Sequence, residues 1–211
     1  MRDAIKLRYR LIPYLYSLTL QSHRDGSPVI RPLVYQFQGD NRTDEISFEY
    51  MLGPWLLVAS VYEEGARQRS LYLPSAGQWC DFFTGTWYNG GQDITVDVPL
   101  NQPGALFAYE GAVIPTGKNM NFVGESPDNA RIFLLFPPLQ DGVFTSHILE
   151  RNETNGEIIV LTVILKSSRN EVTVLVEVDG EKSLLEYDQI SFMLPPNDPR
   201  SIPKPISLTQ E

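Results

Sequence analysis

LRYRLIPYLYSLTLQSHRDGSPVIRPLVYQF, residues 7–37, combines a helical pattern and a strand pattern in one continuous segment. Apolar side chains recur every three or four residues, which is typical of one face of an amphipathic helix. This stripe contains Leu7, Leu11, Leu15 and Leu18. Gly26 and Pro28 then end the helical pattern, and the apolar run Val29–Phe37 predicts a strand.

Pro13 lies inside the predicted helix. A proline in a helix removes one backbone hydrogen bond and clashes with the preceding turn. The sequence therefore predicts a kink near residues 9–13.

A single helix–strand unit cannot close a parallel sheet, because such a sheet needs helices over both faces. We therefore expect residues 1–39 to be the last part of a larger α/β domain. The leucine stripe would then lack most of its partners, and exposed apolar stripes favour association. From this we predict possible self-association of the isolated chain.

The remainder of the sequence predicts short strands at regular spacing, which favours antiparallel β-sandwiches. The proximal set is predicted at 55–61, 70–73, 79–83, 94–98, 106–109 and 112–114. The distal set is predicted at 132–136, 143–149, 157–166, 171–178 and 189–193. A segment rich in Gly, Asn and Pro, residues 116–129, is the expected linker between two sandwich domains at 40–118 and 119–195. Residues 196–211 form a Pro-rich tail, expected to be extended or disordered.

Composition excludes several classes of function. The net charge of −9 and the lack of a Lys/Arg-rich run argue against nucleic-acid binding. The sequence contains no run of about 18 apolar residues, so we predict no membrane span. The single cysteine, Cys80, forms neither an internal disulfide nor a zinc site, and we expect it to be buried. We predict no catalytic, metal or cofactor-binding residue in the chain.

Several motifs occur in one order: LRYRLIPYLYSL, GSPVIRPL, YMLGPWLLVASV and GARQRSLYLPSAGQWCDFFTG. Together they closely resemble the C-terminal part of glycoside hydrolase family 31, which contains α-glucosidases and α-xylosidases. The resemblance implies a mainly β fold, with two antiparallel β-sandwich domains preceded by the helix–strand remnant of a (β/α)8 barrel at residues 1–39.

The same resemblance implies that both catalytic aspartates lie upstream of this chain. The intact enzyme would hydrolyse terminal α-linked glucose or xylose with retention, and this chain alone would be structural and inactive. Its implied partners are an upstream catalytic barrel and, in the intact enzyme, a carbohydrate substrate.

Gly39-Asp40-Asn41 resembles the context of the family's acid/base aspartate. Its position argues against that role, because in the family the aspartate precedes the helix, whereas Asp40 follows the RPL segment. We expect Asp40 to be a polar loop residue with turn chemistry.

The aromatic set around residue 80 allows two interpretations. Trp79, Trp87 and Tyr88 are candidates for sugar contact, because sugars stack their C–H faces on exposed aromatic rings. The other interpretation is core packing, since about half of the side chains in a strand point inward. The alternative function is therefore a β-sandwich carbohydrate-binding module, which requires these rings to line an exposed face.

Two Asn-x-Thr sequons begin at Asn41 and Asn152, both in predicted loops. Such sequons are acceptors for N-glycosylation in secreted proteins. They favour a secreted or secretory-pathway eukaryotic protein.

Overall fold

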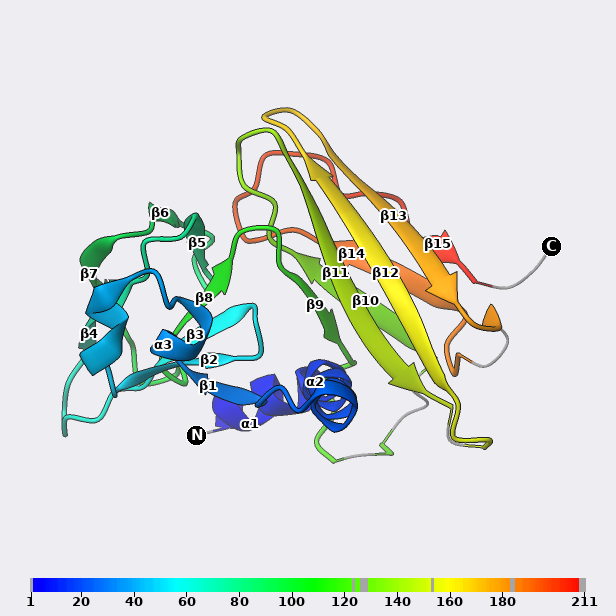
Figure 1. The fold of residues 1–211 in the computed structure, drawn as a ribbon, viewed down its shortest axis with the longest axis horizontal. Helices are drawn as coiled ribbons and strands as arrows, with labels where there is room; N and C mark the ends of the chain where they lie inside the picture. Colours follow the sequence, from blue (N-terminus) through cyan, green and yellow to red (C-terminus); the bar gives the residue numbers. More distant parts are fainter. Residues whose placement is uncertain (1, 123, 126–128, 153, 183–184, 209–211) are drawn as a thin grey trace. The chain divides into compact units, whose positions relative to one another are not determined.

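The computed structural model describes residues 2–122, 124–125, 129–152, 154–182 and 185–208. Most of the regular structure consists of strands in antiparallel sheets, with few helices, which confirms the predicted mainly β fold class. The chain divides into two compact units (Figure 1). Unit 1 comprises Met1–Ile5, Pro28–Glu110 and Pro195–Asn197, and unit 2 comprises Lys6–Ser27, Gly111–Leu194 and Asp198–Glu211.

Unit 1 contains a six-stranded sheet and a separate pair of strands. The sheet has the order β1-β2-β3-β8-β5-β6, and β4 pairs with β7. The bounds are β1 Ile30–Pro32, β2 Glu49–Leu52, β3 Leu56–Ala59, β4 Gln68–Leu73, β5 Gln78–Asp81, β6 Trp87–Asn89, β7 Gln92–Asp97 and β8 Ala105–Tyr109. Two short helical segments, α3 Leu33–Gln36 and η1 Asn41–Glu45, lie between β1 and β2. Most strands predicted in this part exist within a few residues of their expected limits.

The core of unit 1 consists of apolar side chains from the six-stranded sheet, the strand pair and α3. Its largest fully buried members are Trp79, Phe107, Leu33, Met51, Leu57 and Leu73. In strand β4, Leu71 and Leu73 are buried, whereas Gln68 and Ser70 are exposed. Arg69 is buried as well, so the first four residues of β4 alternate between exposed and buried, as in a half-buried strand.

The predicted strand Val29–Phe37 is wrong beyond Pro32. Strand β1 stops at Pro32, which cannot donate a backbone hydrogen bond and lies in the edge strand of the sheet. Residues 33–36 form α3, which places Leu33 in the core. β1 pairs with β2, so it is part of the sheet of unit 1. Arg31 is buried there and donates from Nε to the Pro28 carbonyl at 2.8 Å and from Nη1 to Gln36 Oε1 at 3.1 Å.

The helical segment is interrupted at the position that Pro13 predicts. Helix α1 is Arg2–Arg10 and helix α2 is Ile12–Asp25, with Leu11 outside both helices. Pro13 lies in the first turn of α2, where a proline is tolerated because that N–H has no helical partner. Gly26 ends α2 with φ 77°, a left-handed conformation that glycine adopts without steric cost.

Helix α2 packs within unit 2, against β11 and β9 (Figure 1). Leu11 and Leu18 are buried, and Ser17 Oγ accepts a 2.9 Å hydrogen bond from the backbone N–H of Leu149 in β11. β11 is an edge strand, so the helix supplies a partner for a backbone group that the sheet leaves unpaired. The expectation that the leucine stripe lacks partners is therefore wrong for Leu11 and Leu18.

Unit 2 contains two sheets. One has the order β15-β14-β10-β9 and the other the order β11-β12-β13. The bounds are β9 Val113–Thr116, β10 Ala130–Leu135, β11 Gly142–Arg151, β12 Ile158–Ser167, β13 Val172–Asp179, β14 Gln189–Met193 and β15 Ile206–Ser207. The pairing is antiparallel except between β10 and β14, which run parallel.

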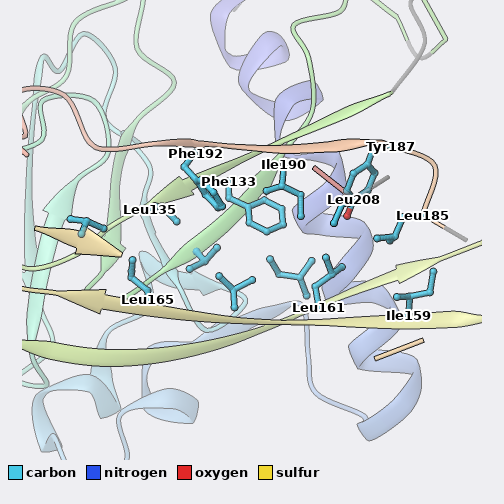
Figure 2. Close-up of a cluster of buried hydrophobic side chains, with 14 residues drawn as sticks. Phe133, Leu135, Ile159, Leu161, Leu165, Leu185, Tyr187, Ile190, Phe192 and Leu208 are labelled. Atoms are coloured by element: carbon cyan, nitrogen blue, oxygen red, sulfur yellow. The ribbon is translucent and has the colours of Figure 1, made fainter. Parts of the chain in front are cut away.

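The core of unit 2 fills the space between these two sheets (Figure 2). Phe133 and Leu135 of β10 and Ile190 of β14 approach Leu161 and its neighbours on β12. Strand β12 alternates buried and less buried residues along its whole length, as a strand with one face on a core does.

The C-terminal tail is anchored in unit 2 rather than disordered over residues 198–208. Arg200 is buried, and its guanidinium donates hydrogen bonds to the carbonyls of Pro137, Pro138 and Ser168. Leu208 is buried in the core, and β15 pairs with β14. The Pro-rich composition predicted an extended or disordered tail, and Arg200 and Leu208 hold this segment in place.

The limits of the units differ from the predicted domain boundaries at 39, 118 and 195. β9 pairs with β10, so residues 117–129 connect neighbouring strands of one sheet, and the change from unit 1 to unit 2 falls between Glu110 and Gly111. The assignment of residues 1–39 to a barrel remains a prediction.

Candidate functional site

Asp40 connects the loop after α3 to strand β4 of unit 1. Its Oδ2 atom accepts hydrogen bonds from the Tyr72 hydroxyl and from the Ser75 backbone N–H, both at 2.8 Å. Its Oδ1 atom accepts from the backbone N–H of Arg42 at 3.2 Å, which caps the first turn of η1. Through these hydrogen bonds Asp40 holds its loop against the segment 72–75, and its bond with Arg42 agrees with the predicted turn chemistry.

The pKa shifts of Asp40 and Tyr72 favour a structural role for these residues over a role in proton transfer. Burial alone raises the pKa of Asp40, but hydrogen bonds from Ser75, Tyr72 and Arg42 together hold that pKa below its ordinary value. Burial and the Asp40 hydrogen bond raise the pKa of Tyr72 to about 12. A general acid at neutral pH needs a raised pKa, and Asp40 has a lowered one.

Trp79 does not belong to any surface site in this fold. Its side chain is 0% exposed, and its indole Nε1 donates to the Pro74 carbonyl at 3.1 Å. The rings of Phe37 and Tyr109 pack against it, with centroids 5.7 and 5.0 Å away. A sugar cannot stack on a ring enclosed in this way, so the candidate role of Trp79 in sugar contact is corrected to core packing.

Trp87 and Tyr88 lie in β6, the edge strand of the same sheet, and both are half-buried. The Tyr88 ring packs edge-on against Phe107 with a centroid distance of 6.0 Å. Burial, followed by the nearby charge of Asp81, raises the pKa of the Tyr88 phenol. The three predicted rings thus do not form one exposed platform, and sugar contact by Trp87 and Tyr88 stays a prediction.

A different pair of aromatic rings is exposed in unit 1. Phe48 and Tyr62 are 58% and 54% exposed, and their rings stack with centroids 4.4 Å apart and an angle of 21°. Phe48 directly precedes β2, and Tyr62 follows β3. Because β2 and β3 are antiparallel neighbours, this topology brings the two residues together. Neither residue stands out in the sequence, since each is a single aromatic beside a strand.

Next to this pair, two adjoining depressions open on unit 1. One has a volume of about 150 Å³ and is lined by residues that include Tyr62, Gln68 and Arg69. The other has a volume of about 260 Å³ and reaches the loop 98–104. Both are lined by Val61, Glu63 and Ala66, so the two depressions adjoin each other after the end of β3. We call the two depressions together the 60–69 groove, and Phe48 stacks on Tyr62 beside it.

Arg69 lies at one end of the groove and is only 8% exposed. Its Nη2 atom is 2.5 Å from Glu49 Oε1, and its Nη1 donates to the Ser70 carbonyl at 2.6 Å. Its guanidinium carbon lies 4.9 Å from the centre of the Tyr62 ring. Burial raises the pKa of Glu49, and the charge of Arg69 offsets only part of this effect. The Nε atom of Arg69 is buried and has no hydrogen-bond partner among the described residues.

The two sequons differ in their surroundings. Asn41 is exposed at the start of η1. Asn152 lies between β11 and β12, where its Oδ1 atom accepts hydrogen bonds from the backbone N–H groups of Thr154 and Asn155. Glycosylation at either position stays a prediction. Cys80 is buried, as expected.

Across the described part of the chain, no group of three or more His, Cys, Asp or Glu side chains is arranged to hold a metal ion. None of the helices in the described ranges has the length and apolar character needed to cross a membrane.

Comparison with known proteins supports the motif resemblance. Residues 26–114 match the family model described as the glycosyl hydrolase family 31 C-terminal domain. An α-xylosidase from Saccharolobus solfataricus is 40% identical over 118 residues, which are 56% of this chain and 16% of that protein. The human neutral α-glucosidase C is 36% identical over 139 residues, 64% of this chain and 15% of that protein.

Solved structures show the same fold over most of the chain. A family 31 dextranase from Flavobacterium johnsoniae superimposes with a TM-score of 0.76 at 28% identity, covering 90% of this chain and 24% of that one. An α-xylosidase from Xanthomonas citri gives a TM-score of 0.75 at 26% identity, covering 92% and 21%. The chain thus spans between 11% and 19% of the length of the curated relatives it matches.

Proposed function

We propose that this chain is the non-catalytic C-terminal part of a retaining α-glycosidase, because residues 26–114 match the glycosyl hydrolase family 31 C-terminal domain model. The family match over this segment, together with the similarity to relatives named α-xylosidase and neutral α-glucosidase C, is the observation that carries the proposal. In the intact enzyme, an upstream barrel would supply both catalytic aspartates and hydrolyse terminal α-linked glucose or xylose.

The local chemistry of Asp40 supports a non-catalytic role. Retaining hydrolysis needs a pair of carboxyl groups about 5–5.5 Å apart, one of which holds a proton at neutral pH. Asp40 instead has a lowered pKa, and both of its carboxylate oxygens accept hydrogen bonds that hold its loop in place. The family-like Gly-Asp-Asn context therefore does not make Asp40 an acid/base candidate.

The contact with the upstream barrel would involve the face of α2 that unit 2 does not cover. Ile12 and Tyr16 are exposed on this helix, whereas Leu11 and Leu18 are buried. Exposed apolar side chains on one helix face support a protein contact there. In the isolated chain the same face would mediate the predicted self-association, which light scattering over a concentration series would detect.

An activity assay tests the proposal. The purified chain should not hydrolyse nitrophenyl α-glucoside or α-xyloside, and Asp40→Asn introduced into a full-length relative should leave its turnover nearly unchanged. A general acid contributes about 10²–10⁴-fold to a rate, so a loss of that size with normal folding would overturn the assignment of Asp40. Turnover by the purified chain, abolished by a single Asp or Glu substitution, would overturn the non-catalytic assignment itself.

A further inference from the structure

We propose that the 60–69 groove of unit 1 is a binding site for a neutral sugar, in which the stacked Phe48–Tyr62 pair supplies the apolar contact. The site uses none of the aromatic residues that the sequence suggested. The argument rests on three observations: exposed rings already held in place, a groove beside them with polar side chains, and a buried arginine with an unused donor.

The rings of Phe48 and Tyr62 are exposed to solvent and held in a fixed stack. More than half of each side chain faces solvent, although the rings stack at 4.4 Å. Arg69 holds the Tyr62 ring further, through the 4.9 Å contact of its guanidinium carbon with the ring centre. A rigid ring loses little conformational entropy when a ligand binds, so an exposed but fixed pair binds more tightly than two mobile rings would.

The groove offers hydrogen-bonding groups next to these rings. Glu63 presents a carboxylate, and Gln68 and Arg67 present donors. Gln68 Nε2 also donates to Asp97 Oδ1 at 2.9 Å, which fixes the orientation of the amide. An apolar face with a few fixed polar groups matches a sugar ring, which has a C–H face and a rim of hydroxyl groups.

Arg69 indicates where a hydroxyl group would be bound. A buried donor without an acceptor is unfavourable, so native structures rarely retain one without a reason. Tyr62 lies over the Arg69 guanidinium, and both residues line the smaller depression. A ligand oxygen bound in this depression would supply the acceptor that the Nε–H group of Arg69 lacks.

The local charges favour a neutral ligand. Glu63 and the neighbouring exposed Glu64 would repel an anion, as would the net charge of −9. Arg67 and Arg69 would repel a cation. The volumes of about 150 and 260 Å³ lie below those of most drug-sized pockets, and they suit one or two sugar rings lying along a surface groove.

A titration monitored by backbone amide NMR tests the proposal, with maltotriose as the probe. The choice of an α-glucan rests on the proposed function, but the assay requires no turnover. We expect shifts in residues 61–69, with a Kd on the order of 1 mM, as is usual for weak binding. Tyr62→Ala should weaken binding at least about tenfold, which corresponds to about 1.4 kcal/mol, whereas Tyr62→Phe should retain it.

Tyr35→Ala is the matched control. Tyr35 is also an exposed tyrosine of unit 1 with an arginine over its ring, because Arg31 lies 5.6 Å from the ring centre. It lies outside the groove, and its replacement should leave the Kd unchanged. All three variants change exposed side chains, and their amide spectra report directly whether each one folds.

Three outcomes would overturn the site: no shifts within residues 61–69 at saturating sugar, unchanged binding by Tyr62→Ala, or shifts with sulfate but not with maltotriose. Binding of cellotriose in place of maltotriose at the same residues would support the site and count against the α-glycosidase assignment. Turnover by the purified chain would contradict the proposed function and leave the groove unaffected. The two proposals can therefore fail independently.

Discussion

Unit 1 and unit 2 each bury an arginine that carries a carboxylate partner, but they use it differently. Arg200 in unit 2 donates to three backbone carbonyls, to Ser167 Oγ and to both oxygens of Asp198. Arg69 in unit 1 has one carboxylate partner, one carbonyl partner and an Nε atom without any partner in the described chain. A fully satisfied buried charge fixes structure, whereas an incompletely satisfied one beside a groove is a candidate for binding.

The two units can be followed separately because tryptophan fluorescence reports on unit 1 alone. All three tryptophans, Trp55, Trp79 and Trp87, belong to unit 1. Tryptophan fluorescence therefore follows the unfolding of unit 1, and amide hydrogen exchange in β12 follows that of unit 2.

The largest expected effect concerns Arg200. Arg200→Met would leave Asp198 and several carbonyls buried without partners, and breaking a buried pair costs roughly 3–5 kcal/mol. We expect faster exchange in β12 and release of β15, with the fluorescence transition of unit 1 nearly unchanged. Arg169→Met, at an exposed position, is the control. An equal shift of both probes would mean that the two units unfold as one.

The corresponding core substitution in unit 1 is Trp79→Ala. Removing a fully buried tryptophan costs about 3–5 kcal/mol, and the Pro74 carbonyl also loses its indole donor. Amide exchange in β8 measures the loss. The matched variant Trp87→Ala, at a half-buried edge position, should cost clearly less. Equal effects of the two variants would contradict the distinction between a core ring and an edge ring.

Ser17→Ala tests the attachment of α2 to unit 2. It would leave the backbone N–H of Leu149 without its acceptor, at a cost of about 1–3 kcal/mol. Exchange at Leu149 and its neighbours in β11 should accelerate, and unit 1 should not respond. Thr19→Ala on the exposed side of the same helix is the control. Unchanged exchange at Leu149 would mean that α2 does not cover this edge in solution.

The smallest effect is a difference in pH dependence. Burial alone raises the pKa of Asp198, but the Arg200 hydrogen bonds and charge hold that pKa below its ordinary value. A carboxyl with a lowered folded-state pKa stabilises the fold above its unfolded pKa of about 3.9, and this contribution is lost as the pH falls through the folded value.

Urea unfolding over an acidic pH series should therefore show unit 2 losing stability below about pH 4, with the loss reduced by Asp198→Asn. The pKa of Glu49 in unit 1 is raised, so the contribution of Glu49 is present at low pH and decreases as the pH rises through its folded value. The contributions of Asp198 and Glu49 to the free energy of unfolding should therefore change with pH in opposite directions. An unchanged pH dependence in Asp198→Asn would rule out the Asp198 contribution.

The sequence by itself determined the class of the fold and the resemblance to a known family. The period of two in β4 and β12, the break at Pro13 and the end of α2 at Gly26 all follow from local rules of backbone and side chain. The motif order indicated the resemblance to family 31, and residues 26–114 match that family's C-terminal domain model. The turn that Asp40 forms with the Arg42 backbone N–H was also predictable, because the two residues are close in sequence, whereas the hydrogen bonds of Asp40 with Tyr72 and Ser75 were not.

Only the tertiary structure decided which side chains are enclosed and which remain at the surface. An aromatic residue in or beside a strand has the same sequence signal whether its ring lies in the core, as Trp79 does, or is exposed, as Tyr62 is. Arg200 gave no signal in a Pro-rich tail because its carbonyl acceptors lie more than 30 residues away. Burial and distant hydrogen bonds depend on which segments meet in space, and that pairing is not encoded in local periodicity.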